Sequence, residues 1–517
     1  MSEKRQTCDK LKVAYTLEVG MNMAKLEGII LINSSTAALQ IIDVKNGKKI
    51  ENVNREFSES DINTPTFSIE IMRRILEQVQ SFQQLLRDYG VNDIRLFGSE
   101  ALSQVKNAVY FADQIESTTG LRISWLNGNQ ESYYRQLAVR HAQEIQHTVL
   151  IEKNTFVLGM SSGRIDLGYF EKNRFEFSQH SSVGPVKLAQ AINGMSVEVA
   201  QEKSLASEFI SSKLADFWHM LPPFKQTETL ILLGADSAQR IFSPKNEPWI
   251  VVSKEQLQIV INDLAIMNDQ AIIGKYAVDL NDVPFALTEM LLLMNIMTAI
   301  GVNTLQISNL TVLDGLSVID DHAEDDIITA ARGIADRYMV EEKHREIVLI
   351  YARQLFDRLK KIHHLNKRDR LLLGVAALVH DVGGFINSQK HYQYSEEILE
   401  GIDFHGLSTS EQRMIAAIAR YHSAETPDNA LRTVQDFSPQ QRLRIAKLAA
   451  LLRLADALDD SRLQKISKLT VSMSDDSITI IGQTIVDLQL EIYMFAQKAK
   501  FFETVFGLPI VLSLIHI

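Results

Sequence analysis

Cysteine is almost absent from this chain, which has a single one, Cys8, among its 517 residues. One cysteine excludes a framework of internal disulfides and is typical of a reducing compartment, so we expect a cytoplasmic protein. The first twenty residues also lack the charged, then apolar, then small-residue pattern of a secretory signal peptide. The longest apolar stretch, residues 285–302, is interrupted by Glu289 and Asn295. It is too short to span a bilayer comfortably, so we expect a buried helix and no membrane association.

An excess of positive charge is also missing. The formal net charge is −11 at pH 7. A protein with that balance does not attract nucleic acid through its overall field, so we expect no DNA partner. A polyanionic ligand would need a local basic site or bound metal ions. The densest basic stretch, residues 358–370, is typical of a solvated helix face. Four of its members are nevertheless candidates for drawing an anionic substrate towards the motif that follows them: Lys360, Lys361, Lys367 and Arg368.

The composition that remains, 46% hydrophobic and 23% charged residues, is that of an ordinary soluble chain. Its length is enough for roughly three or four domains. Residues 28–44 and residues 148–171 each have the pattern of a strand, a small-residue turn and a second strand. These similar openings, about 120 residues apart, predict a duplicated α/β unit.

From residue 323 to about residue 465 helical periodicity replaces the strand signals, and a short β pattern and one more helix follow. We therefore predict an α/β plus all-α fold. Its expected parts are an N-terminal extension over 1–24, α/β units over 25–148 and 149–320, a helical domain over 321–465 and a small α+β segment over 466–517.

Metal-ligand side chains recur along the helical region. The apolar run 371–379 ends in His380 and Asp381, and Gly383 and Gly384 break the helix directly afterwards. Three further residues of this kind lie on separate predicted helices: His344, His422 and Asp456. A His-Asp pair alone is equally well explained as a core histidine capped by its neighbour. The wider set favours a metal site, in which mixed nitrogen and carboxylate ligands suit Mn²⁺, Fe²⁺ or Mg²⁺.

The order histidine, then His-Asp, then a distant aspartate resembles the ligand set of the HD phosphohydrolase superfamily. The resemblance implies that four residues bind a divalent metal, Mg²⁺ or Mn²⁺: His344, His380, Asp381 and Asp456. His422 would lie beside the metal or contact phosphate, as a catalytic residue. Such a metal lowers the pKa of a bound water and neutralises phosphate charge. The alternative is an inherited structural clasp that ties the helices together.

A second resemblance covers residues 25–510. In order, the chain carries "ILINSSTAALQII", "FGSEALSQVKN", "TTGLRISWLNGNQESYYRQLAV", "FVLGMSSGRIDLGYFE", "LILLGADSAQRI" and "LDGLSV". This series is similar to the motifs of the exopolyphosphatase/guanosine pentaphosphatase family, of which the chain is identified as a divergent member. The resemblance implies two actin-like lobes of ribonuclease-H-like fold followed by an HD-type helical domain. It also implies phosphoanhydride hydrolysis, and we expect a homodimer.

The lobes depart from the family at most functional positions. Leu31 and Gly159 stand where the family has aspartates, and neither offers a metal ligand. Gln130 stands in place of the catalytic glutamate and cannot accept a proton from water. Glu131 and Asp166 remain as candidate catalytic acids, although Glu131 is turned by about 100° on a helix relative to Gln130. The candidate phosphate-binding residues are Ser34, Ser161, Ser162 and Gly163. The competing interpretation is that these segments are plain turns in lobes kept for their shape.

Two functions follow from these patterns. The first is a metal-dependent phosphohydrolase acting on inorganic polyphosphate or a guanosine penta- or tetraphosphate-type nucleotide, with a degenerate lobe site and a better preserved HD site. The alternative is a catalytically silent regulator that binds polyphosphate or a nucleotide. The intact ligand set favours the enzyme, whereas the altered lobe motifs favour the regulator.

Overall fold

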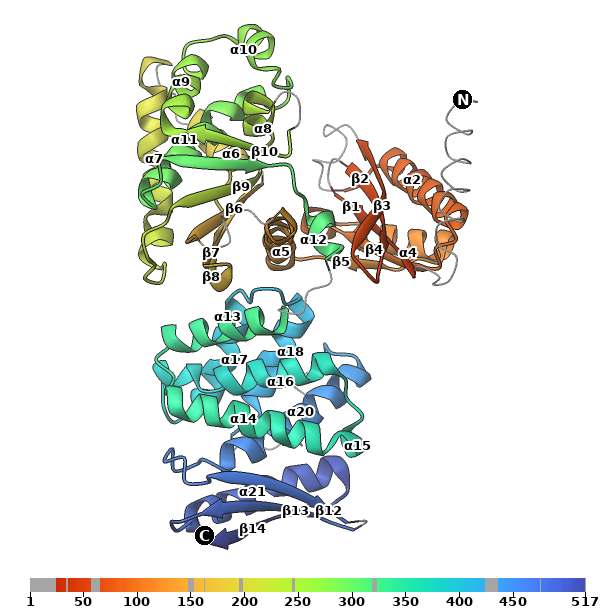
Figure 1. Ribbon diagram of the computed structural model, residues 1–517, viewed down its shortest axis with the longest axis vertical. Helices are drawn as coiled ribbons and strands as arrows, with labels where there is room; N and C mark the ends of the chain where they lie inside the picture. The colour runs from red at the N-terminus through yellow and green to blue at the C-terminus, as the bar shows by residue number, and fades with distance from the viewer. Residues whose placement is uncertain are drawn as a thin grey trace. The chain divides into compact units, whose positions relative to one another are not determined.

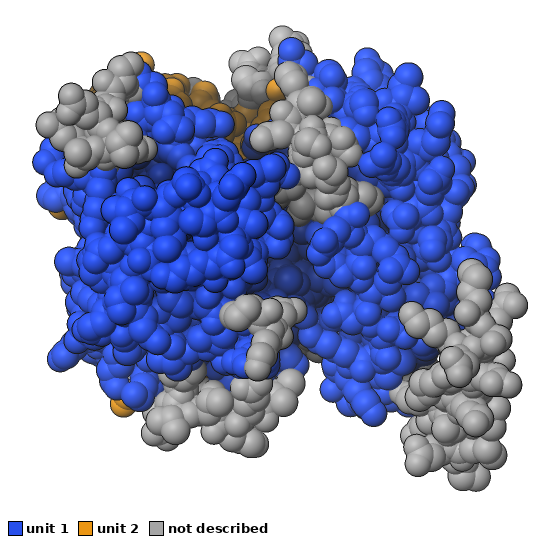
Figure 2. Space-filling model, turned by 90° about the horizontal axis from the view of Figure 1, so that it is seen from above, with its two compact units in different colours: residues 1–167, 180–320 blue, residues 168–179, 321–517 orange. Residues whose placement is uncertain are grey.

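The computed structural model describes ten stretches of the chain: residues 25–33, 36–56, 66–146, 153–161, 163–194, 199–243, 247–318, 323–423, 436–474 and 476–516. The chain forms two compact units, which Figure 2 colours separately. The first comprises Met1–Leu167 and His180–Asp320, and the second Gly168–Gln179 and Asp321–Ile517. Among the described helices, none has the length and apolar character needed to cross a membrane.

The first sheet has five strands in the order β3-β2-β1-β4-β5 (Figure 1). They are β1 (Leu26–Ile32), β2 (Thr36–Asp43), β3 (Lys48–Glu56), β4 (Asp93–Gly98) and β5 (Ile123–Trp125). The first three pair antiparallel, whereas β4 and β5 continue from β1 in parallel. Because strand side chains alternate between faces, Ile30 and Ile32 pack against helices α2 (Ile69–Asp88) and α4 (Ala108–Thr119).

The opposite face of this sheet packs against a helix from much later in the chain. Ile29 and Leu31 share a core with α12 (Val312–Leu316), which also contacts α5 (Gly128–Gln146). Leu31, which stands where a metal aspartate was expected from the resemblance, is therefore a core residue that is 4% exposed. A short helix, α3 (Glu100–Ser103), follows β4.

The second sheet has six strands in the order β10-β11-β9-β6-β7-β8. They are β6 (Thr155–Ser161), β7 (Arg164–Glu171), β8 (Arg174–Ser181), β9 (Thr229–Gly234), β10 (Trp249–Ser253) and β11 (Thr304–Ser308). From β8 to β11 the order repeats that of the first sheet, with the first strand central and two parallel strands beyond it. The duplicated α/β unit predicted from the sequence is confirmed. Strand β10 is an antiparallel addition at the edge.

Six helices accompany the second sheet: α6 (Pro185–Asn193), α7 (Val199–His219), α8 (Asp236–Phe242), α9 (Lys254–Leu264), α10 (Asp269–Tyr276) and α11 (Val283–Ala299). The longest apolar stretch of the sequence forms α11, which is buried as expected. Its Glu289 is only 5% exposed and accepts a hydrogen bond of 2.7 Å from the Ala238 N–H at the start of α8. The carboxylate thus provides a hydrogen-bond partner for a backbone N–H in the first turn of α8, inside an otherwise apolar layer.

The second unit is helical and then α+β (Figure 1). Its helices are α13 (Ala323–Arg337), α14 (Glu342–Arg358), α15 (Lys360–His363), α16 (Lys367–Val379), the 3₁₀ helix η3 (Val382–Phe385), α17 (His391–Gly401), α18 (Thr409–Arg420) and α20 (Pro439–Ala457). The end of the chain adds β12 (Lys468–Met473), β13 (Ile478–Thr484), α21 (Gln489–Phe506) and β14 (Ile510–His516). Between residues 330 and 460 the described residues contain no strand, which confirms the predicted helical domain.

One hydrophobic core runs through this unit and includes the C-terminal elements. Helix α16 contacts α13, α14, α18 and α20, and residues 371–379 are all buried. Phe495 and Phe502 of α21 belong to the same core. The hairpin segment Gly168–Gln179 also belongs to this unit, where the ring of Phe175 stacks on that of His405 with centroids 4.2 Å apart.

A glycine contact between α12 and α5 gives a test of the first unit. A methyl group at Gly315 would lie 1.8 Å from the Tyr134 carbonyl oxygen, so we expect Gly315→Ala to destabilise this unit by about 1–3 kcal/mol. Gly274 of α10 is the matched control, because nothing lies within 4 Å of a methyl group there. Gly274→Ala should stabilise by about 0.4–1 kcal/mol.

Tryptophan fluorescence during denaturation measures this unit alone, because it contains all three tryptophans: Trp125, Trp218 and Trp249. Equal midpoints for the two alanine variants would contradict the packing described.

Candidate metal centre

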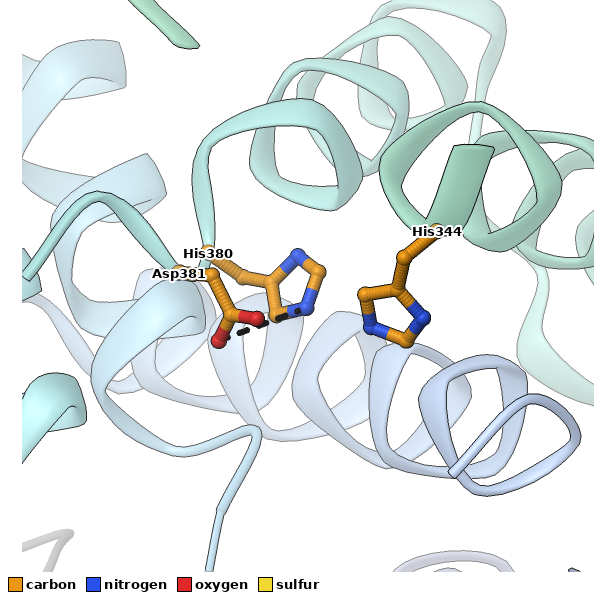
Figure 3. A group of neighbouring side chains, drawn as sticks. All are labelled: His344, His380 and Asp381. Atoms are coloured by element: carbon orange, nitrogen blue, oxygen red, sulfur yellow. Dashed lines mark ion pairs between the residues drawn. The ribbon is translucent and has the colours of Figure 1, made fainter. Parts of the chain in front are cut away.

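The four residues predicted to bind a metal converge in the second unit. His344 projects from α14 and Asp456 from α20, while His380 and Asp381 follow the end of α16. The Oδ1 atom of Asp456 lies 3.2 Å from His344 Nε2 and 3.7 Å from His380 Nε2. His380 Nε2 is 3.6 Å from Asp381 Oδ1, and Figure 3 shows the His344 ring reaching this pair from a neighbouring helix. The potential metal-ligand atoms of His344, His380 and Asp381 all lie within 4.8 Å of one another.

The sequence explains why His380 is held in a fixed position. Helix α16 begins with a capping box of Asn366 and Asp369, and its buried run leads directly to His380, which is fully buried. Gly383 then lets η3 approach α17 closely, because a methyl group there would lie 2.0 Å from the His391 carbonyl oxygen. Gly384 has nothing within 4 Å of such a group, so only the first of the two glycines is required by packing.

A sixth ligand-type residue, His391 at the start of α17, was not identified from the sequence. Its Nε2 atom lies 3.6 Å from Asp381 Oδ1 and 3.1 Å from His422 Nε2. His422 Nε2 is in turn 3.5 Å from Asp381 Oδ1. Asp381 therefore belongs to two ligand groups, one with His344 and His380 and one with His391 and His422. The available signal was a histidine only ten residues after Asp381, within the predicted helical domain.

The three histidines around Asp381 share one hydrogen-bonding pattern. The Nδ1 atoms of His380, His391 and His422 each face the carbonyl oxygen of the residue three positions earlier. A carbonyl only accepts, so in the neutral form of each ring Nδ1 carries the proton and Nε2 presents a lone pair. His380 Nε2 is buried and has no hydrogen-bond partner.

Around Asp381 Oδ1 these three Nε2 atoms therefore gather as acceptors without a donor among them. Nε2 lone pairs and a carboxylate oxygen within 3–4 Å of one another repel unless a cation lies among them. Buried acceptors that lack partners are costly in a folded protein. The donor set, nitrogen and oxygen without sulfur, fits a divalent transition metal or Mg²⁺. The residues present can thus hold a metal in either ligand group.

Three residues of the cluster also contact charged neighbours through the atom that faces away from the other ligand-type residues. Lys498 of α21 pairs with Asp456 Oδ2, and Arg462 pairs with Asp381 Oδ2. Burial alone would raise the pKa of Asp456, but Lys498 and the nearby histidines hold that pKa well below its usual range. Asp459 Oδ2 accepts a hydrogen bond of 2.9 Å from His344 Nδ1. None of Asp459, Arg462 and Lys498 was singled out from the sequence.

Two histidines of the cluster titrate differently. Burial lowers the pKa of His422 to about 4, so this ring is neutral at neutral pH and able to bind a cation. Burial also acts to lower the pKa of His344, but the carboxylates of Asp456 and Asp459 outweigh it and raise that pKa to about 9. A metal at His344 must therefore displace a proton.

Two of the four basic residues expected to attract substrate lie far from the cluster. Lys367 and Arg368 lie at the start of α16, and its 13 residues span about 20 Å before His380. Arg368 is also bound to Glu411, with its Nε atom 2.6 Å from Oε1. A full helix thus separates these two residues from His380, so they do not line the cluster, and their role in drawing substrate towards it stays a prediction.

The candidate acids of the lobes lie together, but each is bound to an arginine. Glu131 Oε1 accepts from the Glu100 N–H at 2.8 Å, and Oε2 lies 3.3 Å from Arg135. Asp166 Oδ1 accepts from Arg164 Nε at 2.7 Å. Burial raises the pKa of both carboxyl groups, and their arginines oppose the rise.

Arg164 also donates to Asn129 Oδ1 at 2.9 Å, so it links β7 to the first turn of α5. Asn127 caps that helix, where its Oδ1 accepts a hydrogen bond of 2.9 Å from the Gln130 backbone N–H. Ser161 is exposed and its hydroxyl faces the Arg164 carbonyl at 3.3 Å. Gly163 lies beside Lys187, since a methyl group on it would lie 2.9 Å from Lys187 Cε. Ser34 and Ser162 lie outside the described residues.

Comparison with known proteins gave matches along most of the chain. A model described as the Ppx/GppA phosphatase family matches residues 41–321, and one described as Ppx/GppA phosphatase, domain III, matches residues 328–492. The guanosine-5'-triphosphate,3'-diphosphate pyrophosphatase of Aeromonas hydrophila is 22% identical over 430 residues, which cover 79% of this chain and 82% of that protein. The protein of the same name from Vibrio cholerae is 20% identical over 444 residues, covering 82% and 86%.

Solved structures of similar proteins were also found. The Ppx/GppA family member of Aquifex aeolicus is 16% identical, with a TM-score of 0.48, covering 56% of this chain and 95% of that one. An exopolyphosphatase from Cytophaga hutchinsonii is 14% identical, with a TM-score of 0.46, covering 56% and 96%.

The acceptor cluster predicts metal binding that can be counted. After incubation with MnCl₂ and desalting, the wild-type protein should retain manganese, whereas a His380→Asn, Asp381→Asn double variant should lose it. The double change removes two ligands from the group that contains His344 and one from the group that contains His422. Elemental analysis measures the bound metal per chain. His364→Asn is the control, since His364 is exposed and asparagine tolerates its left-handed φ of 55°. Equal manganese in the double variant and the wild type would remove the metal site.

The lobe ion pair predicts a pH-dependent loss of stability. Arg164→Met leaves Asp166 buried without its closest cation, and with Arg135 still nearby the cost should fall at the lower end of about 3–5 kcal/mol. The pKa of Asp166, already raised by burial, rises further in this variant. Stability is therefore present at low pH, where the carboxyl is protonated, and is lost as the pH rises through that pKa. Tryptophan-monitored denaturation should show a smaller loss at mildly acidic than at mildly alkaline pH. Adding Asp166→Asn to Arg164→Met should restore most of the lost stability. A loss of stability in Arg164→Met that does not depend on pH would contradict this account.

Proposed function

Because the chain belongs to the Ppx/GppA phosphatase family, we propose that it is a metal-dependent phosphoanhydride hydrolase whose reaction centre is the histidine–aspartate cluster of the second unit. The substrate class is inorganic polyphosphate or a guanosine penta- or tetraphosphate-type nucleotide, as the names of its relatives suggest. The observation that carries the proposal is the approach of three imidazole Nε2 atoms to one oxygen of Asp381, while the Nδ1 atom of each ring faces a backbone carbonyl.

Each residue of the cluster has a distinct task in this proposal. His344, His380, Asp381 and Asp456 hold one divalent metal, Mg²⁺ or Mn²⁺, and Asp381 with His391 and His422 holds another. Such metals supply an activated water and neutralise charge on a phosphoryl group. His422 acts as a ligand, since its pKa of about 4 and its Nδ1 contact leave Nε2 a permanent lone pair at neutral pH.

The surrounding charges keep the ligands in position. Asp459 orients the His344 ring through Nδ1, so that Nε2 faces the other ligands. Lys498 occupies the outer oxygen of Asp456, which leaves Oδ1 on the side of the histidines. Partners of this kind fix the orientation of ligands and strengthen metal binding.

We also propose that the lobes do not hydrolyse phosphoanhydrides. Gln130 cannot act as a base, and Glu131 and Asp166 are each held by an arginine. These same ion pairs favour the second candidate function, a catalytically silent protein that binds a polyphosphate or nucleotide. The two candidates differ in whether the histidine–aspartate cluster turns over substrate.

Phosphate release with Mn²⁺ tests the proposal. Asp381→Asn should reduce turnover of polyphosphate or the guanosine nucleotide by more than about 100-fold, because it removes a residue common to both ligand groups. A Glu131→Gln, Asp166→Asn variant should leave turnover unchanged, as should Asp357→Asn, a half-exposed control paired with Arg370.

Thermal melts of the same proteins separate catalysis from a structural clasp. Lost turnover with an unchanged melt supports catalysis by the cluster. Activity that survives Asp381→Asn and disappears in the lobe variant would place the chemistry in the lobes. A wild-type protein that retains metal but releases no phosphate would favour the silent regulator.

A further inference from the structure

Arg462 lies at the solvent side of the cluster. Its Nη2 atom contacts Asp381 Oδ2, the oxygen turned away from the histidines, and its Nη1 atom lies 3.6 Å from Glu341 Oε2. The Arg462 side chain is 46% exposed, whereas that of Asp381 is 10% exposed. Among the ligand residues His391 is the most exposed, at 23%. Solvent therefore reaches the cluster beside Arg462 and His391.

The backbone that carries Arg462 is strained and firmly held. Arg462 and Gln464 both adopt left-handed conformations, with φ of 58° and 48°, which are unfavourable in residues other than glycine. The Arg462 N–H donates to the Asp459 carbonyl at 2.8 Å, and the Gln464 N–H donates to Asp459 Oδ1 at 2.7 Å. Gln464 Nε2 also donates to the Arg462 carbonyl at 2.8 Å.

Asp459, which anchors this loop, is the same residue that orients His344. The position of Arg462 is thus tied to the position of a ligand. Strain of this kind persists where the surrounding structure fixes it, and it gathers at functional sites.

The second cation of the cluster differs from Arg462 in one respect. Lys498 is 10% exposed and lies between two carboxylates, Asp456 and Asp460, the latter at 3.7 Å. It is enclosed by the protein and balances buried charge. Arg462 instead has a side chain that is 46% exposed, and only the Nη2 atom of its guanidinium is bound to Asp381. Its second carboxylate neighbour, Glu341, lies beyond hydrogen-bond distance, so some of its five N–H donors remain available.

A guanidinium fork matches the oxygens of a phosphoryl group and binds them in a bidentate manner. We infer that Arg462 is a substrate-binding residue of this centre, which contacts the terminal phosphoryl group of the substrate while Asp381 stays in the cluster. The inference rests on the proposed function for the site, and it names the residue that recognises the anion there. It also accounts for anion recognition by a chain with a net charge of −11, since the basic start of α16 is remote.

Calorimetric titration of the manganese-loaded protein with inorganic orthophosphate tests the inference without turnover. Arg462→Gln should weaken orthophosphate binding by about 10–100-fold, the effect of removing one charge-assisted contact, with bound manganese and the thermal melt unchanged. Arg462→Lys keeps the charge and loses the fork, so its affinity for orthophosphate should lie between those of the wild type and Arg462→Gln. Arg413→Gln is the matched control, because Arg413 is 42% exposed and has one carboxylate partner at 3.1 Å. In hydrolysis assays Arg462→Gln should raise KM more than it lowers kcat.

Two results would overturn the inference. One is unchanged orthophosphate affinity in Arg462→Gln, whether or not manganese is lost, since Arg462 then only holds Asp381. The other is a manganese-loaded wild-type protein that binds no orthophosphate. A wild-type protein that binds orthophosphate through Arg462 but releases none from polyphosphate supports the inference and removes hydrolysis instead.

Discussion

The second unit is organised around the need to balance buried lone pairs at Asp381. Three imidazole Nε2 atoms approach one oxygen of this carboxylate. In each ring the Nδ1 atom faces a backbone carbonyl, which favours the proton on Nδ1 and a lone pair on Nε2. That geometry is costly without a cation, so the helices that bring these groups together must be held by something else. The apolar run of α16 does this, because it is buried along its whole length against four other helices.

The lobes resolve a similar problem differently. Glu131 and Asp166 are also buried acids close to one another, but Arg135 and Arg164 neutralise them within the protein. The two halves of the chain thus contain clusters of buried charge that are balanced differently. In the lobes an arginine lies against each acid, whereas at Asp381 Arg462 contacts only Oδ2 and three histidine Nε2 atoms face Oδ1.

The site also depends on parts of the chain that lie outside the helices carrying its ligands. Lys498 comes from α21 of the C-terminal α+β segment, and this segment shares one hydrophobic core with the helices. Asp459 and Arg462 come from the loop after α20. We therefore regard the C-terminal segment as part of the site, because the charge balance at Asp456 requires its lysine.

The sequence by itself determined the architecture and four of the residues that form the histidine–aspartate cluster. The two strand–turn–strand openings and the change of periodicity predicted two α/β lobes and a helical domain, because side-chain period depends only on local sequence. The order of His344, His380, Asp381 and Asp456 likewise identified residues that the fold brings together. What only the tertiary structure decided were the contacts between segments distant in sequence. His391, Lys498 and the pairing of Arg164 with Asp166 have no periodic signal, since they depend on which helix ends and loops meet in space. The remoteness of Lys367 from the site was decided in the same way, because a helix converts thirteen residues into about 20 Å of separation.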